Sequence, residues 1–122
     1  MNILIVDDSK AMRMIIRRTL RQAGYEVDSV REACNGAEGL SAVQEDVPDL
    51  ILCDWNMPEM SGIDFLASLR SSGFETKFGF ITSESTSEMR DKALEAGALF
   101  LISKPFTADN FQENLDPILG SS

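Results

Sequence analysis

Short apolar runs alternate along the chain with longer stretches in which apolar residues recur at helical spacing. The apolar runs predict strands near residues 2–7, 28–34, 49–54, 77–82 and 99–103. The amphipathic stretches predict helices near residues 9–23, 36–46, 61–72, 86–96 and 107–116. The first, third and fifth apolar runs are almost continuous, as is typical of strands covered on both faces. The alternation indicates an α/β fold with a parallel sheet, and right-handed crossovers make it a doubly wound (βα)₅ unit.

Residues that start or stop helices fall at the ends of these stretches. Ser9 is expected to cap the first helix, because its hydroxyl can accept a hydrogen bond from a free backbone N–H group. Gly24, Gly73 and Gly97 each follow a helical stretch and are expected to end it. Pro117 is expected to end or kink the last helix early, because proline lacks the N–H donor.

Length and composition narrow the class of protein. A chain of 122 residues with 43% hydrophobic and 25% charged residues is expected to form one globular domain, residues 1–122, without a separate output domain. Its apolar runs are far shorter than the roughly 20 residues that span a bilayer, and no secretory signal is recognisable, so we expect a cytoplasmic protein. Cys34 and Cys53 do not make a disulfide framework and are expected to be free buried thiols.

Charge and side-chain chemistry exclude several functions. The net charge of −9 argues against nucleic-acid binding, and the absence of histidine excludes imidazole catalysis and histidine-ligated zinc. The charge is uneven, because residues 9–23 carry five cations and no acid. Arg13, Arg17 and Arg21 share one helix face, which predicts either a solvated surface or a docking stripe for an acidic kinase domain.

Acidic residues follow the first and third predicted strands. Asp7 and Asp8 come directly after the first apolar run, and Asp54 ends the third. These strands are expected to be neighbours, so the carboxylates gather at the edge of the sheet where ligands bind in such folds. Two carboxylates about 4 Å apart repel each other by ~4 kcal/mol at an effective dielectric of about 20, so the cluster shifts its pKa values or binds a cation. Oxygen ligands at an exposed edge suit Mg²⁺.

Lys104 and Thr82 are expected at the same edge of the sheet and suggest a second function beside metal binding. An ammonium group and a hydroxyl group beside a metal site are suited to binding a phosphoryl group. A carboxylate can act as a nucleophile and carry that group as an acyl phosphate. Asp54 is the best candidate nucleophile, because it lies between the first two acids and the pair of Thr82 and Lys104.

Four segments together resemble a known family. They are Asp7-Asp8, Asp54 to Gly62, Ile81 to Glu84 and Ser103 to Phe106. In order and spacing they are similar to the signature segments of response regulator receiver domains, most closely those of CheY-like single-domain chemotaxis regulators, and the similarity covers essentially the whole chain. The resemblance implies a flavodoxin-like sheet with strand order 2-1-3-4-5. It also implies a stand-alone response regulator of a two-component phosphorelay, which signals by protein–protein contact.

The resemblance implies a role for each matching residue. Asp54 is implied as the phosphoacceptor, which takes the phosphoryl group from a phosphohistidine of a sensor kinase or histidine phosphotransfer domain. Asp8, Asp54 and the backbone carbonyl of Asn56 are implied as direct Mg²⁺ ligands, with Asp7 acting largely through water. Pro105 is implied to follow a cis peptide bond. The protein would then not be an enzyme, although it would assist its own phosphorylation and dephosphorylation.

Further residues are implied to contact the phosphoryl group or to modulate its lifetime. Lys104, Thr82 and the backbone amides near Asn56 and Ser83 are implied to bind its oxygens. Asn56 and Glu84 flank the site in a pairing that resembles chemotaxis regulators, which implies fast self-catalysed hydrolysis. Together with the phosphoacceptor, Lys104 and Thr82 make up the implied catalytic set.

Two features depart from the family pattern. Leu101 occupies the position where the family often has an aromatic residue that swings inward when the switch is turned on, so the switch is expected to be read out differently. Phe100 is adjacent but is expected to face the other side of the strand. The last helix carries Asp109, Glu113 and Asp116 and no lysine, which weakens the case for a flagellar motor switch protein as the partner.

Several functions remain open at this point. A monomeric phosphorylation switch would act on a downstream protein, or as an intermediate phosphate relay or sink. An aspartyl phosphatase would carry an Asp-x-Asp pattern after the first strand, which Asp7 and Asp8 do not match. A flavodoxin-like cofactor carrier would need a hydroxyl- and glycine-rich loop there. A receiver that binds partners without phosphorylation is disfavoured, because all the site residues are present.

Overall fold

A five-stranded parallel sheet lies at the centre of the computed structural model, which describes residues 1–119. Its strands are β1 (Ile3–Val6), β2 (Val30–Ala33), β3 (Leu50–Cys53), β4 (Lys77–Thr82) and β5 (Phe100–Ser103). They pair in the order β2-β1-β3-β4-β5, which confirms the fold class and the strand order expected from the sequence. Each strand lies within its predicted range, and the largest difference is at β2, where residues 28 and 29 precede the ladder.

The pairing of β1 with β3 decides where the candidate site lies. Val6 is opposite Cys53 in the parallel register, so Asp7 and Asp54 leave the sheet at the same level. The backbone N–H of Asp54 donates to the carbonyl of Val6 at 2.9 Å, and that of Asp7 donates to the carbonyl of Ala33 at 3.1 Å. The ladder therefore continues one residue past the strands and fixes the backbone of both aspartates.

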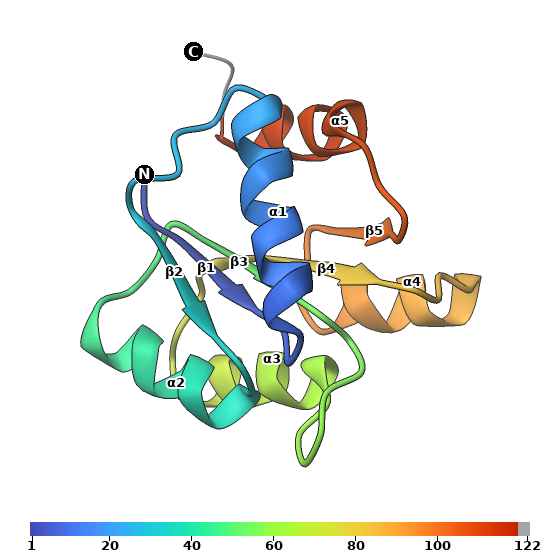
Figure 1. Ribbon diagram of the computed structural model, residues 1–122. Coiled ribbons are helices and arrows are strands. Elements are labelled where there is room, and N and C mark those ends of the chain that lie inside the picture. The colour runs from blue at the N-terminus through green and yellow to red at the C-terminus, as the bar shows by residue number, and fades with distance from the viewer. Residues whose placement is uncertain (120–122) are drawn as a thin grey trace.

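Five helices within residues 1–119 cover both faces of the sheet, and the first four of them connect its strands. They are α1 (Lys10–Gln22), α2 (Gly36–Glu45), α3 (Gly62–Ser71), α4 (Ser87–Glu95) and α5 (Ala108–Leu119). Figure 1 shows α1 and α5 on one side of the sheet and α2, α3 and α4 on the other. None of the helices within residues 1–119 has the length and apolar character needed to cross a membrane.

Side chains that alternate along the strands form two apolar clusters, one on each face of the sheet. Ile3 and Ile5 pack with α1 and α5, whereas Leu4 and Val6 pack with α2, α3 and α4. All four are fully buried. Burial of each such side chain contributes roughly 1.5–3 kcal/mol, which explains why this strand reads as a continuous apolar run. As predicted, Phe100 belongs to the first cluster and its neighbour Leu101 to the second.

The helix ends follow the capping residues of the sequence. The hydroxyl of Ser9 accepts a hydrogen bond from the backbone N–H of Met12, and Gly24 takes the left-handed conformation (φ 96°) after α1, so both predictions are confirmed. The helix does not end at Pro117, which corrects that part of the prediction, because α5 continues to Leu119. The missing N–H costs one hydrogen bond in the last turn, while Ile118 and Leu119 still pack against the core.

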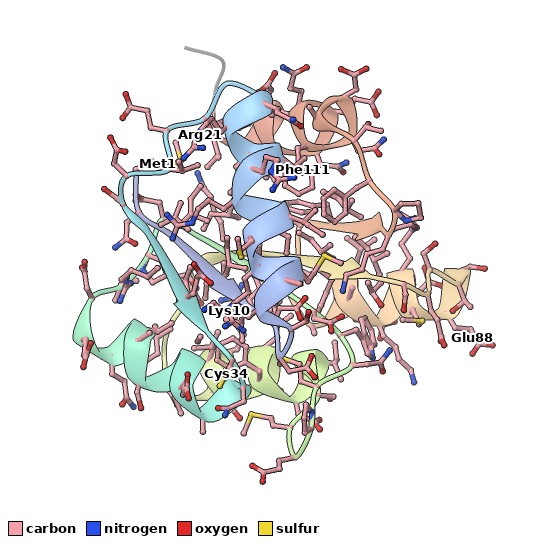
Figure 2. All side chains as sticks on the ribbon, viewed as in Figure 1. Met1, Lys10, Arg21, Cys34, Glu88 and Phe111 are labelled. Atoms are coloured by element: carbon pink, nitrogen blue, oxygen red, sulfur yellow. The ribbon has the colours of Figure 1, made fainter. Side chains whose placement is uncertain are left out.

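The two cysteines differ in environment. Cys53 is fully buried, as predicted, and burial raises its pKa. Cys34 is only half-buried, which corrects the expectation for that thiol. It lies just past β2 (Figure 2), where its thiol donates to the carboxylate of Glu38 at 3.0 Å. The run that predicted a strand through residue 34 ends one residue earlier, and the turn leaves the thiol at the surface.

Replacing Gly79 with alanine is expected to lower the free energy of unfolding by about 1–3 kcal/mol. An added Cβ would lie 2.1 Å from Cζ of Phe100, whose ring is buried against β4. Urea denaturation measures the loss. A Phe100→Leu change should relieve the clash, so the double variant is expected to lose less than the sum of the two single losses. Simple additivity would show that the close approach does not matter.

Candidate functional site

Three carboxylates meet at the carboxyl ends of β1 and β3. Oxygen atoms of Asp7, Asp8 and Asp54 all lie within 4.8 Å of one another. Asp7 is 1% exposed and Asp54 is 9% exposed, whereas Asp8 faces solvent. The sequence predicted this gathering, because it required only that the first and third strands be neighbours. We call these three residues the acid cluster.

Lys104 supplies a cation to the acid cluster from the end of β5. Its ammonium Nζ lies 3.4 Å from Oδ2 of Asp7 and 3.5 Å from Oδ1 of Asp54. The backbone N–H of Lys104 donates to the carbonyl of Thr82 at 2.8 Å, which continues the ladder between β4 and β5 and fixes where the lysine begins. The peptide bond between Lys104 and Pro105 is cis, as the resemblance implied.

Burial is the main influence on the carboxylate of Asp54. It raises the pKa of Asp54 above its ordinary value, because a charged group is disfavoured away from water. The ammonium of Lys104 acts in the opposite direction, and the carboxylate of Asp7 adds to the rise. The nearby backbone N–H groups of Trp55 and Asn56 also favour the charged form. The outcome is a carboxylate that is more basic than one in water.

The residues expected to contact a phosphoryl group lie on the same edge of the sheet. Thr82 ends β4, is fully buried and is paired with Ser103, so it lies beside Lys104. Its hydroxyl accepts a hydrogen bond from the backbone N–H of Glu84 at 3.4 Å. Ser83 and Glu84 are exposed in the loop that follows β4, and Asn56 is exposed in the loop after β3.

The loop between β3 and α3 approaches the acid cluster closely because of Gly62. A Cβ at this position would lie 2.3 Å from the carbonyl oxygen of Asp54. The backbone N–H of Gly62 donates to the carbonyl of Trp55 at 2.7 Å, which closes the loop. Trp55 is half-buried, and its ring packs on Phe80 with 4.7 Å between centroids. This close approach of Gly62 to Asp54 was not predicted from the sequence, although a glycine at the start of a predicted helix can indicate such a close backbone contact.

The arginines of α1 correct one prediction. Arg13 and Arg17 do not line a free docking stripe, because both bind Glu32 of β2, at 2.8 and 3.1 Å. Arg13 is nearly buried, with 13% of its side chain exposed, and it also donates to the backbone carbonyl of Asp7. Arg21 remains exposed. Helical spacing predicted a shared face correctly, but it did not indicate that β2 would cover part of that face.

Leu101 lies away from the acid cluster. It is 4% exposed and packs in the apolar cluster beneath α2, α3 and α4. It also lines a cavity of about 230 Å³ next to β5, together with Leu94, Leu99 and Asn114. The structure therefore places Leu101 on the face of the sheet that α2, α3 and α4 cover, with its side chain among apolar neighbours.

The donor set of the acid cluster fits a small divalent cation that prefers oxygen. Asp7, Asp8 and Asp54 offer only carboxylate oxygens, and Lys104 provides one cation against three acids. Asp8 is exposed, so water can complete the coordination shell, as Mg²⁺ requires. A site of this kind is suited to holding a metal beside an anionic ligand.

Replacing Asp54 with asparagine is expected to raise the melting temperature of the metal-free protein at pH 7. Because the pKa of Asp54 is raised on folding, its negative charge costs stability as the pH rises through that pKa. The gain should shrink as the pH falls through the raised pKa of the folded protein and should be lost below about pH 4, where the carboxyl is neutral in both states. Thermal denaturation across pH values tests this, with Asp91→Asn on the exposed face of α4 as the charge-matched control. A destabilised Asp54→Asn variant at pH 7 would mean that the attraction of Lys104 dominates.

Comparison with known proteins places the chain in a family. A family model described as a response regulator receiver domain matches residues 3–116. The chemotaxis protein CheY1 of Helicobacter pylori is 41% identical over 125 residues, which covers 100% of this chain and 99% of that protein. The chemotaxis protein CheY of Bacillus subtilis is 38% identical over 117 residues, which covers 96% of each chain. The solved structure of the chemotaxis response regulator CheY4 of Vibrio cholerae superposes with a TM-score of 0.83 at 32% identity, covering 97% of this chain and 98% of that one. The chain therefore belongs to the family of response regulator receiver domains.

Proposed function

We propose that this chain is a stand-alone phosphorylation switch that accepts a phosphoryl group on Asp54 and signals by protein–protein contact. The observation that carries the proposal is the acid cluster, with oxygens within 4.8 Å and the Lys104 ammonium 3.4 and 3.5 Å from two of its members. The relatives named as chemotaxis proteins support chemotaxis or motility as the pathway.

The phosphoryl transfer step follows from the chemistry of Asp54. One carboxylate oxygen attacks phosphorus while the bond between phosphorus and the donor histidine nitrogen breaks, and the imidazole leaves with the electron pair. The raised pKa of Asp54 supports this role, because a more basic carboxylate is the better nucleophile. Asp8, Asp54 and the backbone carbonyl of Asn56 would hold Mg²⁺, with Asp7 acting through water, and the bound ion would supply positive charge beside the transferred group.

Lys104 and Thr82 then bind the product of this step. In the unphosphorylated chain the ammonium of Lys104 is shared between Asp7 and Asp54, and phosphorylation gives it new anionic oxygens to contact. We expect the hydroxyl of Thr82, a buried residue, and the backbone amide of Ser83 to donate to the same group. Movement of these groups toward the phosphoryl oxygens would bias a two-state equilibrium toward the active surface.

The protein regulates rather than turning over an external substrate, but its own residues assist both steps. Asn56 and Glu84 are exposed on the two loops that border the acid cluster, where water reaches the acyl phosphate. We assign them control of the hydrolysis rate. Loss of the phosphoryl group by this route returns the switch to its resting state.

A histidine kinase or a histidine phosphotransfer domain is the proposed donor, and a cytoplasmic pathway is the proposed setting. Figure 2 shows Lys10 and Arg21 at opposite ends of α1, and Arg18 lies between them along the helix. All three side chains are exposed, and the start of α1 directly follows the acid cluster. An acidic donor surface would be steered to this helix by its charge.

A downstream protein is the proposed target of the phosphorylated monomer. The surface formed by α4, β5 and α5 is the proposed contact. Asp109 and Glu113 are exposed on α5 and Asp116 is half-buried there, which favours a target with basic residues. A flagellar motor switch protein is a candidate only if its docking segment carries such residues. An intermediate phosphate relay is the alternative.

Fluorescence of Trp55 is expected to change when Mg²⁺ binds and again when acetyl phosphate is added. This single tryptophan follows Asp54 directly and packs on Phe80, so it reports on the acid cluster. In Asp54→Asn the response to acetyl phosphate should disappear, because the nucleophile is absent. If the fluorescence of the wild-type protein did not change with Mg²⁺, the proposed metal site would be wrong. If the response to acetyl phosphate persisted in Asp54→Asn, the assignment of Asp54 as the nucleophile would be wrong.

Charge reversal of the exposed cations, Arg18→Glu with Arg21→Glu, is expected to slow phosphotransfer from a phosphohistidine protein about tenfold at low salt. The difference from wild type should narrow as salt rises, because steering between exposed charges is screened. Phosphorylation by acetyl phosphate should be unchanged, which provides the control within the same proteins. Equal slowing with both donors would point to damage of the acid cluster instead of docking.

A further inference from the structure

A guanidinium group lies directly behind the acid cluster and contacts its backbone. Arg13, in the first turn of α1, donates through Nη1 to the backbone carbonyl of Asp7 and through Nε to Oε1 of Glu32 at 2.8 Å. We infer that Arg13 is a positioning residue for the metal ligands Asp7 and Asp8, and that Glu32 holds it in place. The inference rests on the proposed function, because it concerns the affinity of the acid cluster for Mg²⁺.

The contact with the carbonyl of Asp7 completes the hydrogen bonding of that residue. Its backbone N–H donates to Ala33 at 3.1 Å, its Oδ1 accepts from the backbone N–H of Ser9 at 2.9 Å, and its Oδ2 lies 3.4 Å from Nζ of Lys104. The carbonyl of Asp7 belongs to the peptide unit that joins it to Asp8. Since a peptide unit is planar, fixing this carbonyl also fixes where the backbone nitrogen and Cα of Asp8 lie.

Glu32 holds the guanidinium from β2, where its backbone lies opposite Ile5 of β1 in the parallel register. Its other carboxylate oxygen, Oε2, accepts separately from Arg17 at 3.1 Å, and Arg17 donates to the backbone carbonyl of Val30 at 3.2 Å. Burial opposes ionisation of Glu32, but hydrogen bonds from Arg13 and Arg17 outweigh it and lower the pKa of that carboxyl. Glu32 is therefore charged at neutral pH and is tied to the sheet through β2. Figure 1 shows β2 running beside α1, the helix that carries both arginines.

Positioning and simple electrostatics predict opposite effects of removing Arg13. A positive charge behind the carboxylates repels an incoming cation, so its loss on electrostatic grounds alone would tighten Mg²⁺ binding. If Arg13 orients Asp7 and Asp8, its loss lets the turn between β1 and α1 relax and weakens binding. Groups that orient metal ligands are typically worth about 10–100-fold in metal affinity. The sign of the change therefore separates the two effects.

The test is a titration of the full chain with magnesium chloride, followed by Trp55 fluorescence and by calorimetry. Arg13→Ala is expected to raise the Kd for Mg²⁺ about tenfold. Arg13→Lys keeps the charge, but its single ammonium group cannot span both acceptors, so its Kd should also rise several-fold. This second variant keeps the test valid if the alanine variant folds poorly.

Two matched controls separate positioning from general damage. Arg17→Ala also loses one positive charge and a bond to Glu32, but no contact with Asp7, and Arg18→Ala loses an exposed cation of the same helix. Both should bind Mg²⁺ within about twofold of wild type, whatever their stability to urea. An unchanged or lower Kd in the Arg13 variants, or an equal rise in Arg17→Ala, would overturn the inference alone. A wild-type chain that does not bind Mg²⁺ would overturn the proposed function and this inference with it.

Discussion

Mutual repulsion among Asp7, Asp8 and Asp54 is the constraint on which the rest of the structure depends. Unit charges about 4 Å apart repel each other by ~4 kcal/mol at an effective dielectric of about 20, and a domain of this size is stable by only about 5–15 kcal/mol. The carboxylates are held within 4.8 Å because fully buried strands carry them there, with the ammonium of Lys104 offsetting part of the repulsion. Apolar burial on both faces of the sheet thus maintains an arrangement that a bound cation would stabilise further.

The edge strand β2 carries charged side chains that protect the edge of the sheet and also contact residues beside the acid cluster. Its outer edge has no further strand among the described residues, and an unpaired edge invites association with other chains. Arg31 binds the carbonyl of Ala42 on one face, and Glu32 holds Arg13 and Arg17 on the other. Charged side chains therefore protect the edge, and one of them also reaches the backbone of Asp7.

The parts of the structure that the sequence predicted are those set by periodicity and by register. Apolar runs that end in Asp7 and Asp54 indicated neighbouring parallel strands, and that pairing alone brings the acids together. Contacts that depend on side-chain direction could not be predicted in this way. The contact of Arg13 with the carbonyl of Asp7 and the close approach of Gly62 to Asp54 require the three-dimensional arrangement of the loops. The end of the last helix was predicted too early at Pro117 for a related reason. Packing of the last turn against the core outweighed the one missing hydrogen bond.

Leu101 limits how a movement at the acid cluster could reach the surface of the protein. This side chain is already buried in the apolar cluster of α2, α3 and α4, so it has no exposed position from which to swing inward. The loop after β4 is connected more directly, because the hydroxyl of Thr82 accepts from the backbone N–H of Glu84 and the hydroxyl of Ser103 donates to that of Ser85 at 2.7 Å. Ser103 immediately precedes Lys104. A displacement of the Lys104 backbone would therefore either stretch the hydrogen bond to Ser85 or move Ser85 with it. Thr82, Ser103 and Ser85 thus link the ends of β4 and β5 to the following loop through hydroxyl groups, whereas residue 101 is a leucine and not an aromatic residue.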